Sequence, residues 1–245
     1  MRYFFGSLKN NIQLSHKWHK TPQKGRYLMQ NKTKRITESA MLLAVAIVLE
    51  LVSKMLIPEM PFGGQVTLVS MLPVVLISYR HGVKWGLVAG VTYAVLEMAL
   101  GAKTVAAAFQ PGYFGDSVML LNAFIMCALD YLLAFTVLGL GGCFRNRIAN
   151  PGVALLCGSL VALGARYLAH IGSGYILFSG WAEWFFTQDG FPAWGAQLVS
   201  SLSPQMLGLV YSVVYNGMYM LPEMLLTAVC SLVLAKVPTI VRKIS

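Results

Sequence analysis

Six apolar segments dominate this chain of 245 residues, and they constrain its fold more than any other feature. They cover residues 37–57, 67–79, 82–100, 118–144, 153–178 and 207–237. A helix needs about 20 apolar residues to cross the hydrocarbon core of a bilayer, so five of these segments are long enough to span. The second has only 13 residues and includes Pro73, which predicts a short, tilted or partly re-entrant helix.

The composition agrees with this pattern. Hydrophobic residues make up 57% of the chain and charged residues 11%, whereas a soluble domain carries about 25% charged residues. So few charges cannot coat a water-facing globule of this size, which excludes a cytosolic enzyme, a nucleic-acid-binding domain and a disordered chain. We therefore predict an all-α integral membrane protein with six transmembrane helices, located in the cell membrane.

The basic residues predict the orientation of the helices. With six spans, 16 of the 19 Lys and Arg residues fall on one side, which the positive-inside rule assigns to the cytoplasm together with both termini. Nine of them lie in residues 1–35, which contain no Asp or Glu and resemble a cytoplasmic anchor beside anionic lipid. We divide the chain into this basic arm and a membrane domain over residues 36–245, with Met29 as an alternative start. No nucleic-acid partner is expected.

The opposite loops are acidic on balance and include one long connection. They hold Glu59, Asp116, Glu183 and Asp189 against Lys103. The connection over residues 180–206 is rich in Trp and Phe, which is typical of an interfacial helix or aromatic belt. The same segment is also suited to be a lid over an outward-facing pocket, and both interpretations stay open.

Ionisable residues within the spans are costly in lipid, so each needs a partner or a function. Glu50 and Lys54 are one helical turn apart and are expected to neutralise each other. Arg166 is expected to pair with a carboxylate from another helix, and the candidates are Asp130, Glu97 and Glu223.

A second group of polar residues indicates a ligand pocket in the outer half of the last three spans. It comprises Asp130, Tyr131, His170, Tyr211 and Asn216. The carboxylate supplies charge, the aromatic rings supply faces for stacking and cation–π contact, and the imidazole and carboxamide supply directed hydrogen bonds. This combination suits a planar, cationic ligand that forms hydrogen bonds.

Small residues and missing motifs complete the pattern. Gly82, Gly86, Gly90 and Ala94 follow one another at intervals of four residues and thus form a stripe along one helix face, which allows close helix packing. The sequence has no P-loop motif, no HExxH motif and no Cys/His cluster at metal-ligand spacing. We therefore predict no catalytic residue, no metal site and no cofactor, and the chain is not expected to be an enzyme.

Several motifs together resemble the thiamine-specific S component of energy-coupling factor (ECF) transporters. They cover roughly residues 36–237 in order, and they lie at 61–73, 79–86, 129–135, 166–170 and 211–223. The resemblance implies a six-helix vitamin-binding subunit whose site is closed by the loop between its first two helices. It also implies two cytoplasmic ATPases and a transmembrane coupling subunit as partners, with thiamine as the ligand.

The same resemblance implies roles for individual residues. Asp130, Tyr131, His170, Tyr211 and Asn216 match the ligand-binding residues of the family, with Asp130 in place of the usual Glu. Tyr93 corresponds to an aromatic residue on the third helix, and Phe178 stands where the family has a stacking Trp. Ala40 and Ala44 match the face that docks onto the coupling subunit.

Two alternatives to thiamine uptake through an ECF complex remain open. The chain is also consistent with an S component for a thiamine precursor or another heterocyclic vitamin. A solitary secondary carrier is the third reading, although no internal repeat of the kind seen in such carriers stands out.

Overall fold

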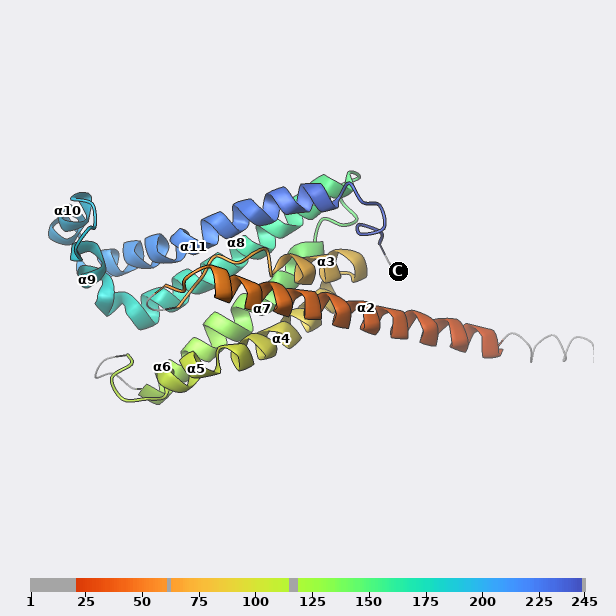
Figure 1. The fold of residues 1–245 in the computed structure, drawn as a ribbon, viewed down its shortest axis with the longest axis horizontal. Coiled ribbons are helices and arrows are strands. Elements are labelled where there is room, and N and C mark those ends of the chain that lie inside the picture. The colour runs from red at the N-terminus through yellow and green to blue at the C-terminus, as the bar shows by residue number, and fades with distance from the viewer. Residues whose placement is uncertain (1–20, 61–62, 115–118, 244–245) are drawn as a thin grey trace, which may run out of the picture. The chain divides into compact units, whose positions relative to one another are not determined.

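The fold is given by a computed structural model that describes residues 21–60, 63–114 and 119–243. These residues form helices joined by turns and loops (Figure 1). The chain divides into two units, residues 1–41 and 42–245, and the first helix begins in one unit and ends in the other. Residues 1–20, which make up most of the predicted basic arm, lie outside the described residues, and so does the acidic residue Asp116.

The helices follow one another with short connections. In chain order the α-helices are α2 (Thr21–Leu56), α3 (Leu72–His81), α4 (Val83–Leu100), α5 (Ala102–Ala108), α6 (Met119–Met126), α7 (Ala134–Thr136), α8 (Pro151–Phe178), α9 (Ala182–Thr187), α10 (Trp194–Ser201) and α11 (Pro204–Leu234). Between them lie the π-helix η1 (Cys127–Leu133) and the 3₁₀ segments η2 (Val137–Gly142) and η3 (Ser179–Trp181).

The two longest helices of the second unit begin at well-formed caps. The side chain of Asn150 accepts hydrogen bonds from the backbone N–H groups of Gly152 and Val153, and α8 then starts with a proline. Ser203 caps α11 in the same way, again before a proline. Such caps satisfy the free N–H groups of the first turn, and proline fits there because it has no N–H to lose. Both helices therefore start where the sequence changes from loop to apolar segment.

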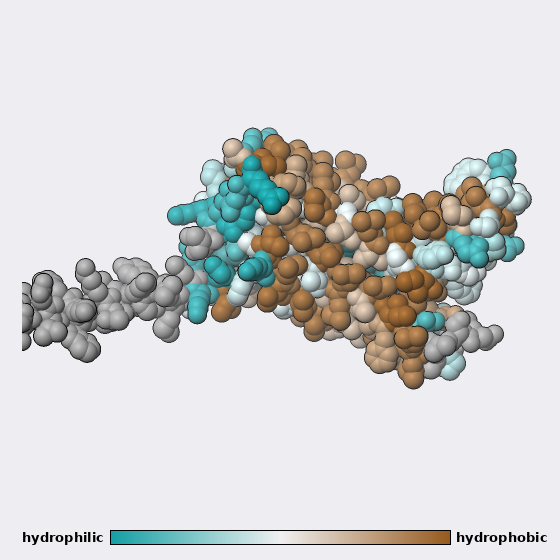
Figure 2. Space-filling view, turned by 180° about the vertical axis from the view of Figure 1, so that it is seen from behind, coloured by the Kyte–Doolittle hydropathy of each residue, from teal (hydrophilic) through white to brown (hydrophobic). Residues whose placement is uncertain are grey.

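Within the described residues, five stretches are long and apolar enough to cross a membrane: Lys32–Leu56, Val83–Leu100, Leu120–Gly142, Pro151–Thr187 and Pro204–Leu234. Apolar side chains cover the middle of the face seen in Figure 2, and hydrophilic side chains gather toward the ends. These findings agree with the predicted class, an all-helical membrane protein with several spans.

The second apolar segment differs from the prediction. A helix was expected over residues 67–79, but α3 begins only at Leu72 and extends to His81. Pro73 stands in its first turn, and the residues before it turn back so that Thr67 bonds to a distant carboxylate. Nine of the ten α3 residues are buried in the protein. A helix too short to span a bilayer is therefore covered by its neighbours rather than exposed.

The fourth apolar segment is continuous but irregular. It passes from α6 through the π-helical η1 into α7 and then into η2. A π-helical stretch inserts extra residues per turn and is frequently found at functional sites. Here it carries Asp130.

The glycine stripe of α4 packs as predicted. A Cβ atom added to Gly90 would lie 2.8 Å from the backbone oxygen of Phe135, and one added to Gly86 would lie even closer to Ser78 of α3. Gly139 of η2 abuts the backbone of α4 in return. A side chain at these glycines would collide with the neighbouring segment, so α3, α4 and η2 pack tightly against one another.

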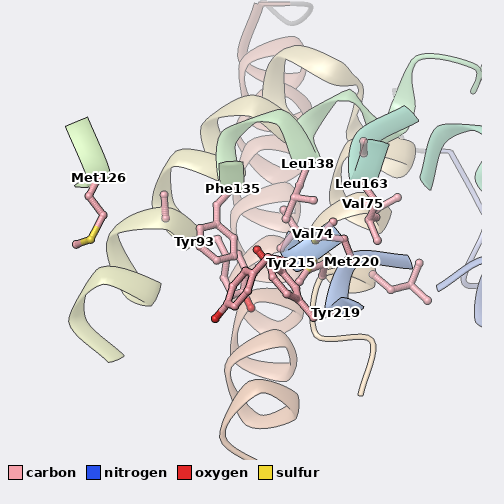
Figure 3. Close-up of a cluster of buried hydrophobic side chains, with 14 of the residues drawn as sticks. Val74, Val75, Tyr93, Met126, Phe135, Leu138, Leu163, Tyr215, Tyr219 and Met220 are labelled. Atoms are coloured by element: carbon pink, nitrogen blue, oxygen red, sulfur yellow. The ribbon is translucent and has the colours of Figure 1, made fainter. Parts of the chain in front are cut away.

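The centre of the second unit is a cluster of buried apolar side chains. Val74 and Val75 of α3 meet Leu138, Leu163 and Met220, which come from η2, α8 and α11 (Figure 3). The helices α8 and α11 lie side by side, and α9 and α10 connect their ends (Figure 1). This core holds α4, η1, α8 and α11 around the space described next.

Candidate functional site

Asp130 is held by two residues of α8. Its Oδ1 lies 2.9 Å from Nδ1 of His170, and its Oδ2 accepts a hydrogen bond of 2.6 Å from the hydroxyl of Ser173. Both partners lie on one face of α8, three residues apart, and η1 turns Asp130 toward them. The carboxylate keeps further acceptor capacity, since each oxygen offers more than one lone pair.

Arg166 fixes the protonation pattern of His170. Its Nε donates a hydrogen bond of 3.2 Å to Nε2 of His170, one turn further along α8. Because Nε2 is an acceptor in this arrangement, the ring proton of a neutral imidazole is assigned to Nδ1, which donates to Asp130. The carboxylate, the imidazole and the guanidinium thus form one chain.

The prediction that Arg166 pairs with a carboxylate from another helix was wrong. In the described part of the chain, no ion pair joins Arg166 to Asp130, Glu97 or Glu223. Its Nη1 donates instead to the sulfur of Met71, and its guanidinium carbon lies 4.4 Å from the ring centroid of Phe135. A cation–π contact and a soft acceptor therefore stabilise this cation beside the imidazole.

Glu223 instead anchors the loop between α2 and α3. Its carboxylate accepts a hydrogen bond of 2.7 Å from the backbone N–H of Thr67 and others of 2.8 and 2.9 Å from the Thr67 hydroxyl. Glu223 is fully buried. The pairing spans 156 residues of sequence, which is why no local pattern indicated it.

The predicted neutralisation of Glu50 by Lys54 is confirmed. The ammonium lies 3.7 Å from the carboxylate. The same carboxylate accepts a hydrogen bond of 2.8 Å from the hydroxyl of Ser70. Glu50 therefore also holds the end of the loop that Glu223 anchors through Thr67.

Three residues of α11 complete the polar network. The Asn216 side chain donates to the backbone oxygens of His170 and Ser212, at 3.2 and 2.8 Å, and accepts a hydrogen bond of 2.6 Å from the hydroxyl of Tyr219. The Tyr219 ring meets the His170 ring edge to face at 5.9 Å. Asn216 therefore ties α11 to α8 at the level of the imidazole.

These groups line a cavity of about 150 Å³. Six of the seven predicted ligand-binding residues lie in its wall: Asp130, Tyr131, His170, Phe178, Tyr211 and Asn216. The seventh, Tyr93, is fully buried behind the wall, where it meets the lining residue Phe135 edge to face at 5.3 Å (Figure 3). The structure thus brings together the residues that sequence reasoning grouped, with Tyr93 supporting the wall instead of forming it.

The loop between α2 and α3 forms another part of the wall, through Gly63, Gly64, Gln65 and Thr67. A Cβ atom on Gly64 would lie 2.5 Å from the Tyr219 ring, and its φ of +91° favours glycine. Sequence reasoning did not assign a site role to Tyr219 or to these glycines. The Gly-Gly pair was the signal for a close backbone approach.

The aromatic connection after α8 packs against the same wall. Phe185 of α9 is buried, and its ring lies 5.3 Å from that of Tyr211 and 5.7 Å from that of Tyr215. Trp184 and Trp194 remain partly exposed. One side of the segment therefore covers residues that line the cavity, and the other carries the indole rings typical of an aromatic belt.

Phe178 and Tyr113 meet at the edge of the cavity, with ring centroids 6.5 Å apart. Burial raises the pKa of Tyr113, and the carboxylates of Asp130 and Glu59 raise this pKa further. The phenol thus stays protonated and remains a hydrogen-bond donor at neutral pH.

Comparison with known proteins gives three consistent results. Residues 36–194 match the model of the thiamine transporter protein family (Thia_YuaJ). The thiamine transporter ThiT of Bacillus subtilis (strain 168) is 31% identical over 204 residues, which cover 80% of this chain and 86% of that protein. A solved structure of ThiT from Listeria monocytogenes has a TM-score of 0.56 at 21% identity, covers 86% of this chain and shares its fold.

Proposed function

Because the chain belongs to the thiamine transporter protein family, and is thus a multi-pass membrane transport protein rather than an enzyme, we propose that it captures thiamine as the S component of an ECF transporter. In this proposal the substrate enters from the outer face, and partner subunits supply the energy through ATP hydrolysis. Residues 36–245 then cross the membrane six times with both termini in the cytoplasm, and α3 is the short second crossing.

The observation that carries this proposal is the charge and shape of the cavity wall. Thiamine combines a permanent thiazolium charge with an aminopyrimidine, and both rings are flat. Asp130 offers negative charge beside the imidazole of His170, while Tyr131, Tyr211 and Phe178 offer aromatic surface. A carboxylate with aromatic faces around it is the usual means of binding an organic cation.

Two features support the proposal that other chains supply the ATPase and the coupling subunit. The sequence has no nucleotide-binding motif, so a transporter driven by ATP must obtain its ATPase from other chains. Ala40 and Ala44, one turn apart on α2, are both exposed and offer a smooth surface for another helix. We propose that the coupling subunit docks there.

Binding is tested with the purified full-length protein in detergent or lipid nanodiscs. Mass spectrometry of small molecules that remain bound through purification should detect thiamine, and added thiamine should quench the Trp fluorescence at submicromolar concentration. The separate pyrimidine and thiazole moieties should compete far less well. If neither thiamine nor its moieties bind, the proposed substrate is wrong; tighter binding of one moiety would indicate uptake of a precursor.

Partnership is tested separately by co-expression with an ECF coupling subunit and its ATPases. Replacing Ala40 and Ala44 by Trp should abolish co-purification of the complex and leave thiamine binding by the isolated chain intact. Thiamine uptake into cells or vesicles without any ATPase would favour a secondary carrier instead.

A further inference from the structure

One buried carboxylate in the cavity wall has an oxygen without a partner. Glu97 of α4 is 4% exposed, and its Oε1 atom makes no hydrogen bond in the structure. A buried carboxylate that lacks partners is costly, because the desolvation of its charge is not offset. Glu97 is nonetheless placed at the cavity surface.

The surroundings of Glu97 compensate for its charge only in part. The Tyr93 hydroxyl, one turn earlier on α4, is a nearby donor, and the cations Lys54 and Arg166 act on the carboxylate without an ion pair to it. Glu97 lies in the last turn of α4, which contains no basic residue, and the free carbonyl groups of a helix C-terminus disfavour negative charge. The two cations of the cavity wall are already engaged. Lys54 pairs with Glu50 at 3.7 Å, and Arg166 binds His170 and lies over an aromatic ring.

The other carboxylates of the wall differ from Glu97 in this respect. Both oxygens of Asp130 accept hydrogen bonds within the protein, and Glu50 has an ammonium and a hydroxyl as partners. Glu59 belongs to the loop between α2 and α3 rather than to a spanning helix. Among these carboxylates, the one with a buried oxygen that accepts no hydrogen bond is therefore Glu97, while the side-chain oxygen of Gln65 is another unpartnered acceptor of the wall but carries no charge.

We infer that Glu97 is a second ligand contact of the cavity, which accepts a hydrogen bond from a donor group of a cationic ligand and repels anionic substituents such as phosphate. The inference rests on the proposed function, since it concerns the same cavity and the same ligand. A donor from the ligand supplies the missing partner of Oε1, so its binding is favoured. A phosphate group carries only negative charge and acceptors at neutral pH, and a neighbouring buried carboxylate opposes its entry.

The test compares thiamine with thiamine monophosphate in the wild type and in Glu97→Gln. Glutamine keeps the size of the side chain and removes the charge. We expect the variant to bind thiamine at least fivefold more weakly. The ratio of the two dissociation constants, monophosphate over thiamine, should fall at least tenfold. Glu183→Gln is the matched control, because it removes one negative charge from an exposed position on α9, outside the cavity wall, and should leave the ratio unchanged.

The thermal stability of the empty protein, measured alongside, separates a binding role from a purely structural one. If Glu97→Gln stabilises the empty protein but changes the ratio less than tenfold, Glu97 is a strained core residue and the inference is wrong. If the wild type itself fails to bind thiamine, the proposed function fails, and this inference fails with it. The wild-type and variant measurements therefore distinguish the two failures.

Discussion

The hydroxyl of Tyr215 donates a hydrogen bond of 3.0 Å to the backbone oxygen of Gly63. This contact joins the last long helix, α11, to the loop that follows the first, and both residues line the cavity. Neighbouring Tyr219 contacts the next residue of the loop, Gly64, through its ring. The loop is thus held against α11 by hydrogen bonds and by a close fit that tolerates no side chain.

Gly64→Ala should weaken thiamine binding strongly, because the added methyl group would lie 2.5 Å from the Tyr219 ring. Gly63→Ala is the matched control: its φ of +87° brings similar backbone strain, but no atom lies within 4 Å of the added Cβ. Left-handed strain costs about 1–2 kcal/mol in both variants. We expect affinity for thiamine, measured by calorimetry, to fall further in Gly64→Ala; equal losses would contradict the close-fit explanation.

Asp130→Asn should weaken thiamine binding more than tenfold, or by about 1.4 kcal/mol, because the carboxylate that faces the cation is neutralised. The amide also disturbs the pairing with Ser173 and His170. Asp130→Glu retains the charge and should bind more tightly than the amide variant. Fluorescence titration measures all three proteins, and an unchanged affinity in the Asn variant would remove Asp130 from the binding site.

Phe185→Ala should speed the dissociation of thiamine several-fold, since the ring supports Tyr211 and Tyr215 from outside the cavity. Removing a buried aromatic ring also costs about 3–5 kcal/mol of stability, so thermal unfolding is measured alongside. Trp184→Ala is the control on the same helix, where the indole is 45% exposed. Stopped-flow displacement measures the rate of thiamine dissociation from both variants. If Phe185→Ala releases thiamine at the wild-type rate, α9 belongs only to the aromatic belt.

Gly90→Ala should lower the melting temperature, because its methyl group would lie 2.8 Å from the backbone oxygens of Phe135 and Thr136. Helix propensity alone predicts the opposite sign, with a gain of about 1 kcal/mol for Ala over Gly. Gly164→Ala on α8 tests the effect of helix propensity alone, since no atom lies within 4 Å of its added Cβ. We expect the two variants to move the melting temperature in opposite directions.

Runs of apolar residues were sufficient for the class of protein and for the approximate ends of α4, α8 and α11. These features depend on long runs of one kind of residue or on caps next to them. The grouping of Asp130 with His170 was also accessible, because both are polar residues in the outer half of apolar spans. Thiamine as the ligand came from the resemblance to a family and not from the chemistry alone.

Other features depend on contacts between distant residues and left no local pattern. From the sequence alone, Glu223 was a reasonable partner for Arg166. In the fold it accepts hydrogen bonds from Thr67 instead, which lies 156 residues earlier in the chain. The π-helical turn at Asp130 and the late start of α3 reflect packing against neighbours, which propensity does not encode. Phe185 stood in an aromatic-rich loop, and only the fold revealed which of those rings point inward.

The chain of hydrogen bonds through His170 limits how this residue can take part in recognition. One ring nitrogen donates to Asp130 and the other accepts from Arg166, so neither has a lone pair or proton left for a guest molecule. What the imidazole still offers is its flat π surface and its C–H edge. Selectivity at this position therefore depends on stacking geometry, and a ligand gains nothing there from an additional polar substituent.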